Sequence, residues 1–313
     1  MSKFKFFKFF GLIVIFSAFS FNGFSQTKQK VRTVTIPISI YSEKPLKEQQ
    51  SEEFIEAGDI IVKEDGDDQE ILSIRSVSNT PLSLAVLIQD DLSSNANLQL
   101  ASIADFIKQL PKGSRVMVGY LRGGSLQTRQ KFTDDLEKAA KSLRIVAGRG
   151  VGSGDPFSAV ESALGKFDAL PAGRRAILLV SDGLDVTSGT DIASTVQSIE
   201  LDRVILKAQR KSIAVYSFWN AATLTESGSS ILVTGGQAAL SRLSNETGGR
   251  AFYQGTVSPI SFEPFFKDLT NSLNRQFAIT YLSTHLKKGY HKILVLSTNE
   301  AVKIEHPKGY YYR

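Results

Sequence analysis

The stretch LAVLIQDDLSSN, residues 84–95, and the stretch AILLVSDGLD, residues 176–185, decide the fold of this chain. Each begins as an apolar run of the kind found in strands buried on both faces of a parallel sheet. Each then ends in carboxylates and hydroxyls. In open α/β sheets such side chains meet in a crevice at the carboxyl ends of the strands. The two stretches therefore predict a cluster of hard oxygen ligands, the type that divalent cations prefer.

Between residues 82 and 275 the chain alternates short apolar strands with helical patterns. Apolar residues recur at helical spacing over 100–110, a Pro-Lys-Gly stop follows at 111–113, and a strand is expected at 115–120. Strands separated by helices require crossover connections, and these predict a doubly wound, mostly parallel α/β domain over 82–275. Further helices are expected at 134–143 with Thr133 as N-cap, 156–167 with Asp155 as N-cap, 191–210, 237–246 and 259–275.

Both ends of the chain outside this domain have β character. Segment 26–81 alternates apolar and polar residues over 34–40 and carries Asp65-Gly66, a strong hairpin signal because both residues tolerate positive φ. Segment 276–313 shows strand patterns at 277–282, 292–296 and 302–304. A few strands cannot bury much alone. We therefore predict that the two segments pair into one small β-sandwich, with the α/β domain inserted between them.

Residues 1–25 predict an export signal. Lys3, Lys5 and Lys8 precede an apolar stretch over 9–21, and small residues follow at the positions that a signal peptidase recognises. We expect cleavage after Ser25 and a mature protein in the periplasm or outside the cell, without a stable membrane span; an uncleaved membrane anchor is the alternative. The chain has no cysteine, so core burial alone must hold the mature protein together.

Composition argues against nucleic-acid binding and against common enzyme classes. The net charge of +6 includes the three lysines of the export signal, and the remaining basic residues are scattered. The only histidines are His285, His291 and His306, without zinc-protease spacing, and we interpret them as surface or sheet residues. No Gly-x-Ser-x-Gly elbow is present. We expect no enzymatic activity and no small-molecule substrate.

Four segments together resemble a known family. They are LIQDDLSSN at 87–95, AGRRAILLVSDGLD at 172–185, SNETGGRAFY at 244–253 and GYYYR at 309–313. In this order they are similar to bacterial secreted von Willebrand factor A related proteins of the acidobacterial type. The resemblance covers 31–313 and implies an integrin I-like fold. It also implies a metal-ion-dependent adhesion site: Asp-x-Ser-x-Ser after the first strand, a threonine in a later loop and an aspartate after the fourth strand.

The chain keeps part of that adhesion-site pattern. Asp182 matches the final aspartate. The first element fits in two registers, either Gln89-x-Asp91-x-Ser93 or Asp91-x-Ser93-x-Asn95. The threonine is missing near Gly154, where a hydroxyl or a carboxylate is offered instead, by Ser153 or Asp155. The resemblance thus implies a degenerate Mg²⁺ site of low affinity. The alternative is that these acids and hydroxyls only cap the helices that follow.

The favoured function is a secreted adhesion-type module that binds a protein partner, with or without Mg²⁺. Its contact surface is predicted from the sheet-top loops, at 90–95, 148–155 and 182–190. Two alternatives stay open. One is an exported metal-dependent hydrolase, which needs a base or nucleophile that the sequence does not reveal. The other is a structural subunit of an envelope assembly.

Overall fold

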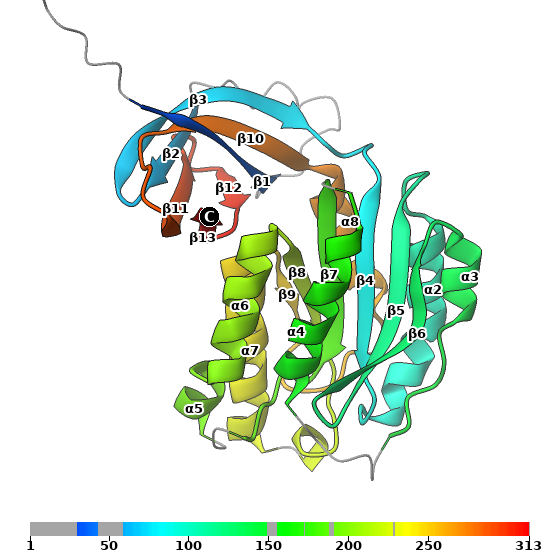
Figure 1. The fold of residues 1–313 in the computed structure, drawn as a ribbon. Coiled ribbons are helices and arrows are strands. Elements are labelled where there is room, and N and C mark those ends of the chain that lie inside the picture. Colours follow the sequence, from blue (N-terminus) through cyan, green and yellow to red (C-terminus); the bar gives the residue numbers. More distant parts are fainter. Residues whose placement is uncertain are drawn as a thin grey trace, which may run out of the picture. The chain divides into compact units, whose positions relative to one another are not determined.

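The structure is a computed structural model that describes residues 30–42, 59–148, 155–171, 173–187, 191–227 and 229–312 (Figure 1). The chain divides into two compact units, Met1–Lys30 and Val31–Arg313, and all elements below belong to the second. The predicted export signal lies outside the described residues. None of the helices in the described ranges is long and apolar enough to cross a membrane.

The centre of the α/β part is a six-stranded sheet in the order β6-β5-β4-β7-β8-β9. Only β6 is antiparallel to its neighbour, and the other pairs are parallel. The strands are β4 Leu82–Gln89, β5 Arg115–Arg122, β6 Ser125–Thr133, β7 Arg174–Ser181, β8 Ala214–Trp219 and β9 Ala251–Phe252. Val86 and Leu87 in β4 are both fully buried and belong to apolar clusters on opposite faces. The doubly wound α/β fold class is confirmed by this arrangement.

Helices cover both faces of this sheet (Figure 1). On one face lie α2 Leu100–Lys108, α3 Leu136–Lys141 and α8 Glu263–Asn274. On the other lie α4 Pro156–Lys166, α6 Ile199–Lys211 and α7 Ser230–Thr247. The single helix expected over 191–210 is instead α5 Ile192–Val196 followed by α6, because the Ser198 hydroxyl accepts from Leu201 N–H and caps a new helix. The expected cap Thr133 ends β6, and Asp135 caps α3.

The remaining strands form a seven-stranded sheet in the order β12-β1-β10-β3-β2-β11-β13. They are β1 Arg32–Ser42, β2 Ile60–Glu64, β3 Asp67–Ser76, β10 Gln276–Ser283, β11 Gly289–Ser297, β12 Val302–Glu305 and β13 Gly309–Tyr312. Strand β1 lies between β10 and β12, so the two ends of the described chain share one sheet. The tight turn joins β2 to β3 at Asp65 and Gly66, both with positive φ.

The predicted β-sandwich of two packed sheets is not confirmed, because the seven strands follow one another in a single strand order. Strand β3 changes partner along its length: Asp67–Gln69 pair with β2, and the residues between Glu70 and Ser76 pair with β10. A bulge between Thr280 and Tyr281 adds local bending. The sheet curls (Figure 1) and encloses its own apolar core, which includes Val34, Ile36, Ile38, Val62, Ile279 and Ile293.

Candidate ligand site at the carboxyl edge of the parallel sheet

Gln89 joins the ends of the two central strands. It ends β4, and Ser181 ends the parallel neighbour β7. The Gln89 amide oxygen accepts from the Ser181 hydroxyl at 2.5 Å and from the Asp182 N–H at 3.1 Å, and its amide nitrogen donates to Asp91 Oδ1 at 2.9 Å. A carboxylate could accept the first two bonds but could not donate the third. Gln89 therefore fastens Asp91 to the end of β7.

Asp182 is almost fully buried at this edge, with 2 % of its surface exposed. One carboxylate oxygen accepts from the Leu184 N–H at 3.1 Å, and the other from the Thr225 hydroxyl at 3.1 Å. Burial disfavours the ionised form and, together with the negative charge of Asp91, raises the pKa of Asp182 to about 6. The carboxylate predicted to be the central ligand is thus held by neutral donors next to a second acid.

Thr225 supplies a hydroxyl that the sequence analysis did not find. It begins a short 3-10 helix after β8 and is buried. Its hydroxyl donates to Asp182 and accepts from the Ala222 N–H at 2.8 Å. The expected threonine position near Gly154 is in a different loop, outside the described residues. The available signal was topological, because the loop after β8, a parallel neighbour of β7, must reach the same edge.

Ser93 and Asn95, the other predicted ligands of the first loop, separate in the structure. Ser93 is buried, and its hydroxyl donates to Asn220 Oδ1 at 3.3 Å while its N–H donates to the Ala221 carbonyl at 2.8 Å. Ser93 therefore ties the first loop to the loop after β8. Asn95 is exposed in the 3-10 helix Ser94–Gln99. The structure places Gln89, Asp91 and Ser93 in the buried edge and leaves Asn95 on the surface.

Asp155 acts as the N-cap of α4. Its two carboxylate oxygens accept from the Phe157 N–H at 2.7 Å and the Ser158 N–H at 3.0 Å. Burial raises its pKa, with a contribution from the nearby charge of Asp185. The capping alternative thus describes Asp155. The other substitute considered for the missing threonine, Ser153, lies outside the described residues.

Several buried carboxylates share this edge. Within the described ranges Asp155, Asp182 and Asp185 form no ion pair. Asp185 is fully buried, one of its oxygens accepts from Thr187, and the other has no hydrogen-bond partner among the described groups. Buried negative charge is costly unless it is neutralised, paired or bound to a metal ion. The edge is therefore chemically suited to a hard divalent cation.

Asp90, which precedes Asp91 in the sequence, is a buried carboxylate with a cationic partner. Its carboxylate receives both terminal nitrogens of Arg144, at 2.7 and 3.0 Å, and the Ala147 N–H at 3.0 Å. Although burial acts in the other direction, these donors hold the pKa of Asp90 below its ordinary value. The Arg144 guanidinium also stacks 3.9 Å from the centre of the Tyr120 ring. Asp90 thus anchors the segment before residue 149 and is not available as a ligand.

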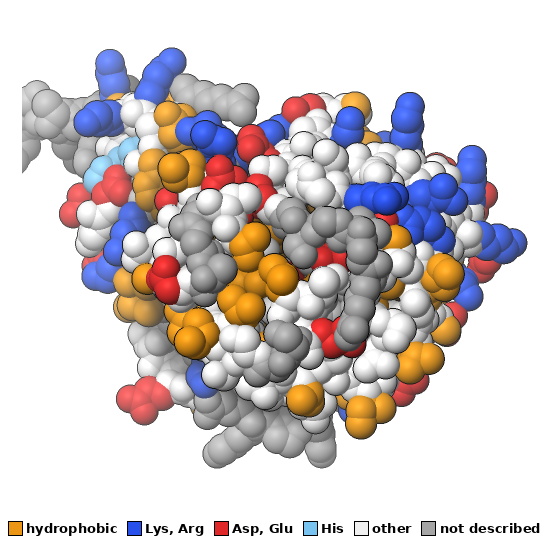
Figure 2. Space-filling view, turned by 90° about the horizontal axis from the view of Figure 1, so that it is seen from below, with side chains coloured by type: hydrophobic (Ala, Val, Ile, Leu, Met, Phe, Trp, Pro, Cys, Tyr) orange, Lys and Arg blue, Asp and Glu red, His pale blue; other side chains and the backbone are white. Residues whose placement is uncertain are grey.

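The loops around this edge expose large apolar side chains. Figure 2 shows hydrophobic and acidic side chains gathered on the face that contains the carboxyl ends of the parallel strands. The segments at that end carry exposed apolar residues, namely Leu98, Ile145, Ile192, Leu224, Ile231, Val257 and Ile260. Ile260 is 94 % exposed and Leu98 is 73 % exposed. Contiguous exposed apolar surface with a polar rim is typical of protein-interaction sites.

Comparisons with known proteins return structural likenesses only. No family model and no curated protein matches the sequence. The structure is similar to the conserved hypothetical protein BatB from Bacteroides thetaiotaomicron, with 13% identity, a TM-score of 0.44, and coverage of 61% of this chain and 97% of that one. It is also similar to an aerotolerance-related membrane protein from Bacteroides fragilis, with 14% identity, a TM-score of 0.41, and coverage of 62% of this chain and 98% of that one. A third similar structure is a von Willebrand factor type A protein from Catenulispora acidiphila, with 10% identity, a TM-score of 0.39, and coverage of 92% of this chain and 75% of that one.

Proposed function

We propose that this protein is an exported protein-binding module of the von Willebrand A type, which presents the loops at the carboxyl edge of its parallel sheet to a protein partner. The observation that carries the proposal is the exposed apolar side chains around a buried acidic edge. Buried apolar anchors supply most of the free energy of protein association, and a polar surround supplies specificity. We place the protein in the periplasm or outside the cell because of the predicted export signal.

A divalent cation at Asp91 and Asp182 is the finer part of the proposal. A hard cation there would neutralise two adjacent carboxylates and keep a free coordination position for a carboxylate of the partner. The Thr225 and Ser93 hydroxyls lie in the same edge as further oxygen donors. Because Gln89 supplies an amide where the adhesion-site pattern has an aspartate, the site has less negative charge, and we expect low affinity.

The contact surface is tested by charged substitutions on its apolar residues. Ile260→Asp and Leu98→Asp should each abolish capture of the partner from a native envelope extract, because a charge would be buried at the interface. Leu72→Asp is the matched control, since Leu72 is 49 % exposed but lies in β3 of the other sheet. Equal capture by all three variants would refute the loop surface as the binding site.

Asp182→Ala tests the cation. We expect calorimetric titration of the exported chain with Mg²⁺ to show weak heat that Asp182→Ala abolishes, because the central carboxylate is lost. His291→Ala, in the other sheet, should leave that heat unchanged. If the unmodified chain gives no heat at millimolar ion and partner capture is insensitive to chelator, the loops act by direct contacts alone and the cation is refuted.

We propose binding without catalysis. A hydrolase would require a base or nucleophile beside the ion, and the described groups that hydrogen-bond to the Asp182 carboxylate include the Leu184 N–H and the Thr225 hydroxyl, neither of which is a base. A structural role in an envelope assembly would use the same surface with a permanent partner. Exchange of a captured labelled partner against unlabelled partner distinguishes a reversible contact from a permanent one.

A further inference from the structure

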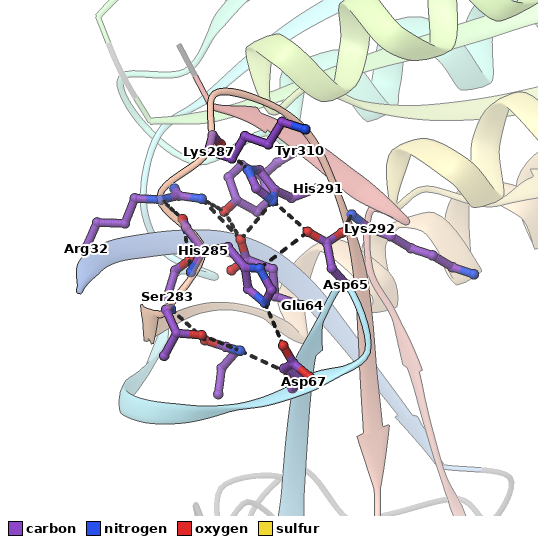
Figure 3. A network of polar contacts seen from close by, with 12 residues as sticks. Arg32, Glu64, Asp65, Asp67, Ser283, His285, Lys287, His291, Lys292 and Tyr310 are labelled. Carbon is purple, nitrogen blue, oxygen red and sulfur yellow. Dashed lines mark hydrogen bonds and ion pairs between the residues drawn. The ribbon is translucent and has the colours of Figure 1, made fainter. Parts of the chain in front are cut away.

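A second polar cluster lies in the seven-stranded sheet, away from the carboxyl edge. Figure 3 shows Asp65, His285 and His291 turned toward one another. Asp65 comes from the tight turn between β2 and β3, His291 from β11, and His285 from the connection between β10 and β11. The sequence predicted both histidines to be surface or sheet residues. Their acidic partner is more than 200 positions away in sequence, which hides the cluster from motif spacing.

The potential ligand atoms of the three residues converge. Asp65 Oδ2 lies 2.8 Å from His291 Nδ1 and 3.8 Å from His285 Nδ1. All three atoms lie within 4.8 Å of one another. Ligands bound to one ion at about 2.0–2.1 Å are separated by a little over 3 Å. Small side-chain rotations are therefore sufficient to place all three atoms around one ion.

The far side of the His291 ring is already fixed in the way that metal-bound histidines are. His291 Nε2 lies 2.7 Å from the backbone carbonyl of Lys287, so Nε2 must carry a hydrogen and donate it. In the neutral ring this leaves the lone pair on Nδ1, toward Asp65 and His285. Metal-bound histidines almost always donate their other ring N–H to a carbonyl or carboxylate. His285 Nε2 similarly faces Asp67 Oδ2 at 3.2 Å, as an ion-pair distance without hydrogen-bond geometry.

The Asp65 carboxylate is positioned by the hairpin itself. Its Oδ1 accepts from the Lys292 N–H at 2.8 Å, and the Asp65 N–H donates to the Lys292 carbonyl at 2.9 Å. Oδ2 is left to the two histidines. The left-handed backbone at Asp65, with φ of 52°, belongs to the turn that fixes this direction. The Asp65 carboxylate is therefore already oriented toward the two histidines.

Glu64 adds a buried carboxylate beside the two histidines. It is fully buried, and its Oε1 accepts from Arg32 and from the Tyr310 hydroxyl and lies 3.3 Å from His291 Nδ1. Its Oε2 has no hydrogen-bond partner among the described groups. Three carboxylates, those of Glu64, Asp65 and Asp67, therefore surround the histidines with one guanidinium. The ammonium group of Lys292 points away from the cluster (Figure 3). Neutral histidines would leave an excess negative charge that one divalent ion balances.

We propose that Asp65, His285 and His291 form a binding site for a divalent transition-metal ion, with Zn²⁺ as the best match. Imidazole nitrogen selects zinc and its neighbours in the first transition row over Mg²⁺ and Ca²⁺. Three protein ligands leave a fourth position to water or to an external ligand. The His285 side chain is 24% exposed and that of Asp65 36%, so the ion can enter from solvent. The ion joins the β2–β3 turn to the β10–β11 connection.

The competing explanation is a protonated His291 that donates from both ring nitrogens, to Lys287 and to Asp65, without a metal. The two explanations differ in their response to Zn²⁺. Calorimetric titration of the metal-free exported chain with ZnCl₂ should show one binding event. Titration with Co²⁺ should give the visible absorption of a four-coordinate ion. Absence of both signals would overturn the proposal and leave the protonated ion pair.

Two conservative variants locate the ion. Asp65→Asn keeps a residue that tolerates the left-handed turn and an oxygen that accepts from the Lys292 N–H. His285→Gln replaces a partly exposed side chain in the connection between β10 and β11. Each should weaken Zn²⁺ binding by at least about tenfold, because a charged or nitrogen ligand is lost. Asp68→Asn is the control, since Asp68 lies in the same hairpin but pairs with Lys63. Unchanged Zn²⁺ binding in both ligand variants would overturn the proposal.

This site is independent of the proposed protein-binding function. Asp182→Ala should bind Zn²⁺ as the unmodified chain does, and Asp65→Asn should retain partner capture and any Mg²⁺ response. Loss of Zn²⁺ binding in Asp182→Ala would place the ion at the carboxyl edge and overturn the assignment to the β sheet. Failure of partner capture in every form of the protein would refute the proposed function and leave the Zn²⁺ measurement intact.

Discussion

At the scale of single residues, the same side chain has opposite properties according to its partner. Asp90 and Asp182 are both buried at the ends of neighbouring strands. Arg144 lowers the pKa of Asp90, whereas the described partners of Asp182 are neutral donors and a neighbouring acid, and its pKa is raised. Burial alone therefore does not identify a structural carboxylate. The acid without a cation is the one whose charge remains to be balanced by a ligand.

His306 gives a residue-scale prediction about pH. It is 2% exposed; its Nδ1 donates to the Pro307 carbonyl at 2.9 Å, and its Nε2 accepts from the Val295 N–H at 3.2 Å. Burial and the charge of Lys308 lower its pKa to about 4 from 6.5. Between these values the unfolded chain binds more protons than the folded one, so the free energy of unfolding falls as the pH is lowered from 7 to 4. The loss from this group is about 3 kcal/mol.

The measurement is denaturant unfolding at several pH values. His306→Gln keeps an acceptor for the Val295 N–H but does not titrate, so its unfolding free energy should fall by about 3 kcal/mol less over the same pH interval. The comparison with the unmodified chain removes the contributions of all other groups. Parallel pH profiles for the two proteins would show that His306 is not held neutral by the fold.

The role of a residue could be predicted from the sequence only where the residue lies at the end of a strand that the sequence itself predicts. Gln89, Asp91 and Asp182 end neighbouring parallel strands, and the structure brings them together as that topology requires. Thr225 was missed because no ligand pattern marks it, and its role depends on the path of the loop after β8. The clustering of His291 with Asp65 was missed because it arises from a strand pairing between the two ends of the chain. Such pairing leaves no trace in local spacing.

At the scale of elements, α7 shows how helix packing shapes the acidic edge. Gly236 lies in α7 against the Asp182–Gly183 backbone, and a Cβ added there would be 2.1 Å from the Asp182 carbonyl oxygen. Gly183, with φ of 70°, meets the same helix from the other side. The glycines at 183 and 236 therefore allow the helix and the ligand loop to touch backbone to backbone. The position of Asp182 thus depends on a residue that never contacts its carboxylate.

Gly236→Ala tests this contact. The added methyl group must displace backbone, so we expect a loss of about 1–3 kcal/mol in the free energy of unfolding. Gly165→Ala in α4 is the matched control, because nothing lies within 4 Å of its added Cβ. There the better helix propensity of alanine should stabilise the protein by about 0.5–1 kcal/mol. Equal effects at the two positions, measured by denaturant titration, would show that α7 does not need the close approach.

Most elements of the α/β part were predictable because their periodicity is strong, whereas boundaries depended on capping. The 191–210 pattern is continuous in hydrophobicity, yet Ser198 starts a new helix by bonding to Leu201. Strand β13 was missed because GYYY, at 309–312, is too short to show alternation, and it is placed only by pairing with β11. The sandwich expectation did not foresee that β3 pairs first with β2 and then with β10, which links all seven strands in one order.

At the scale of the whole molecule, the two sheets are joined where the chain passes between them. Arg174 begins β7, at the opposite end from the acidic edge, and its partly buried guanidinium donates to both chain crossings. Its acceptors are the carbonyls of Ser78 at 2.7 Å, Thr80 at 3.1 Å and Leu273 at 2.9 Å, and Gln276 Oε1 at 2.8 Å. Burial lowers the pKa of Arg174. The acceptors of its guanidinium are neutral oxygens. The Arg174 side chain therefore ties the segment before β4 and the segment between α8 and β10 to the start of β7.

Arg174→Ala should therefore loosen the junction of the two sheets. Removal of the guanidinium leaves the partly buried carbonyls of Ser78 and Leu273 without this donor, and we expect a loss of about 1–3 kcal/mol in the free energy of unfolding. Hydrogen exchange should accelerate at the start of β10, where Gln276 loses its partner. Arg175→Ala is the control, because Arg175 donates to Leu170 and Pro171 within the α/β part. If exchange in β10 is the same in both variants, the junction is held by the packing of α8 and α6 against the curled sheet, and Arg174 only serves β7.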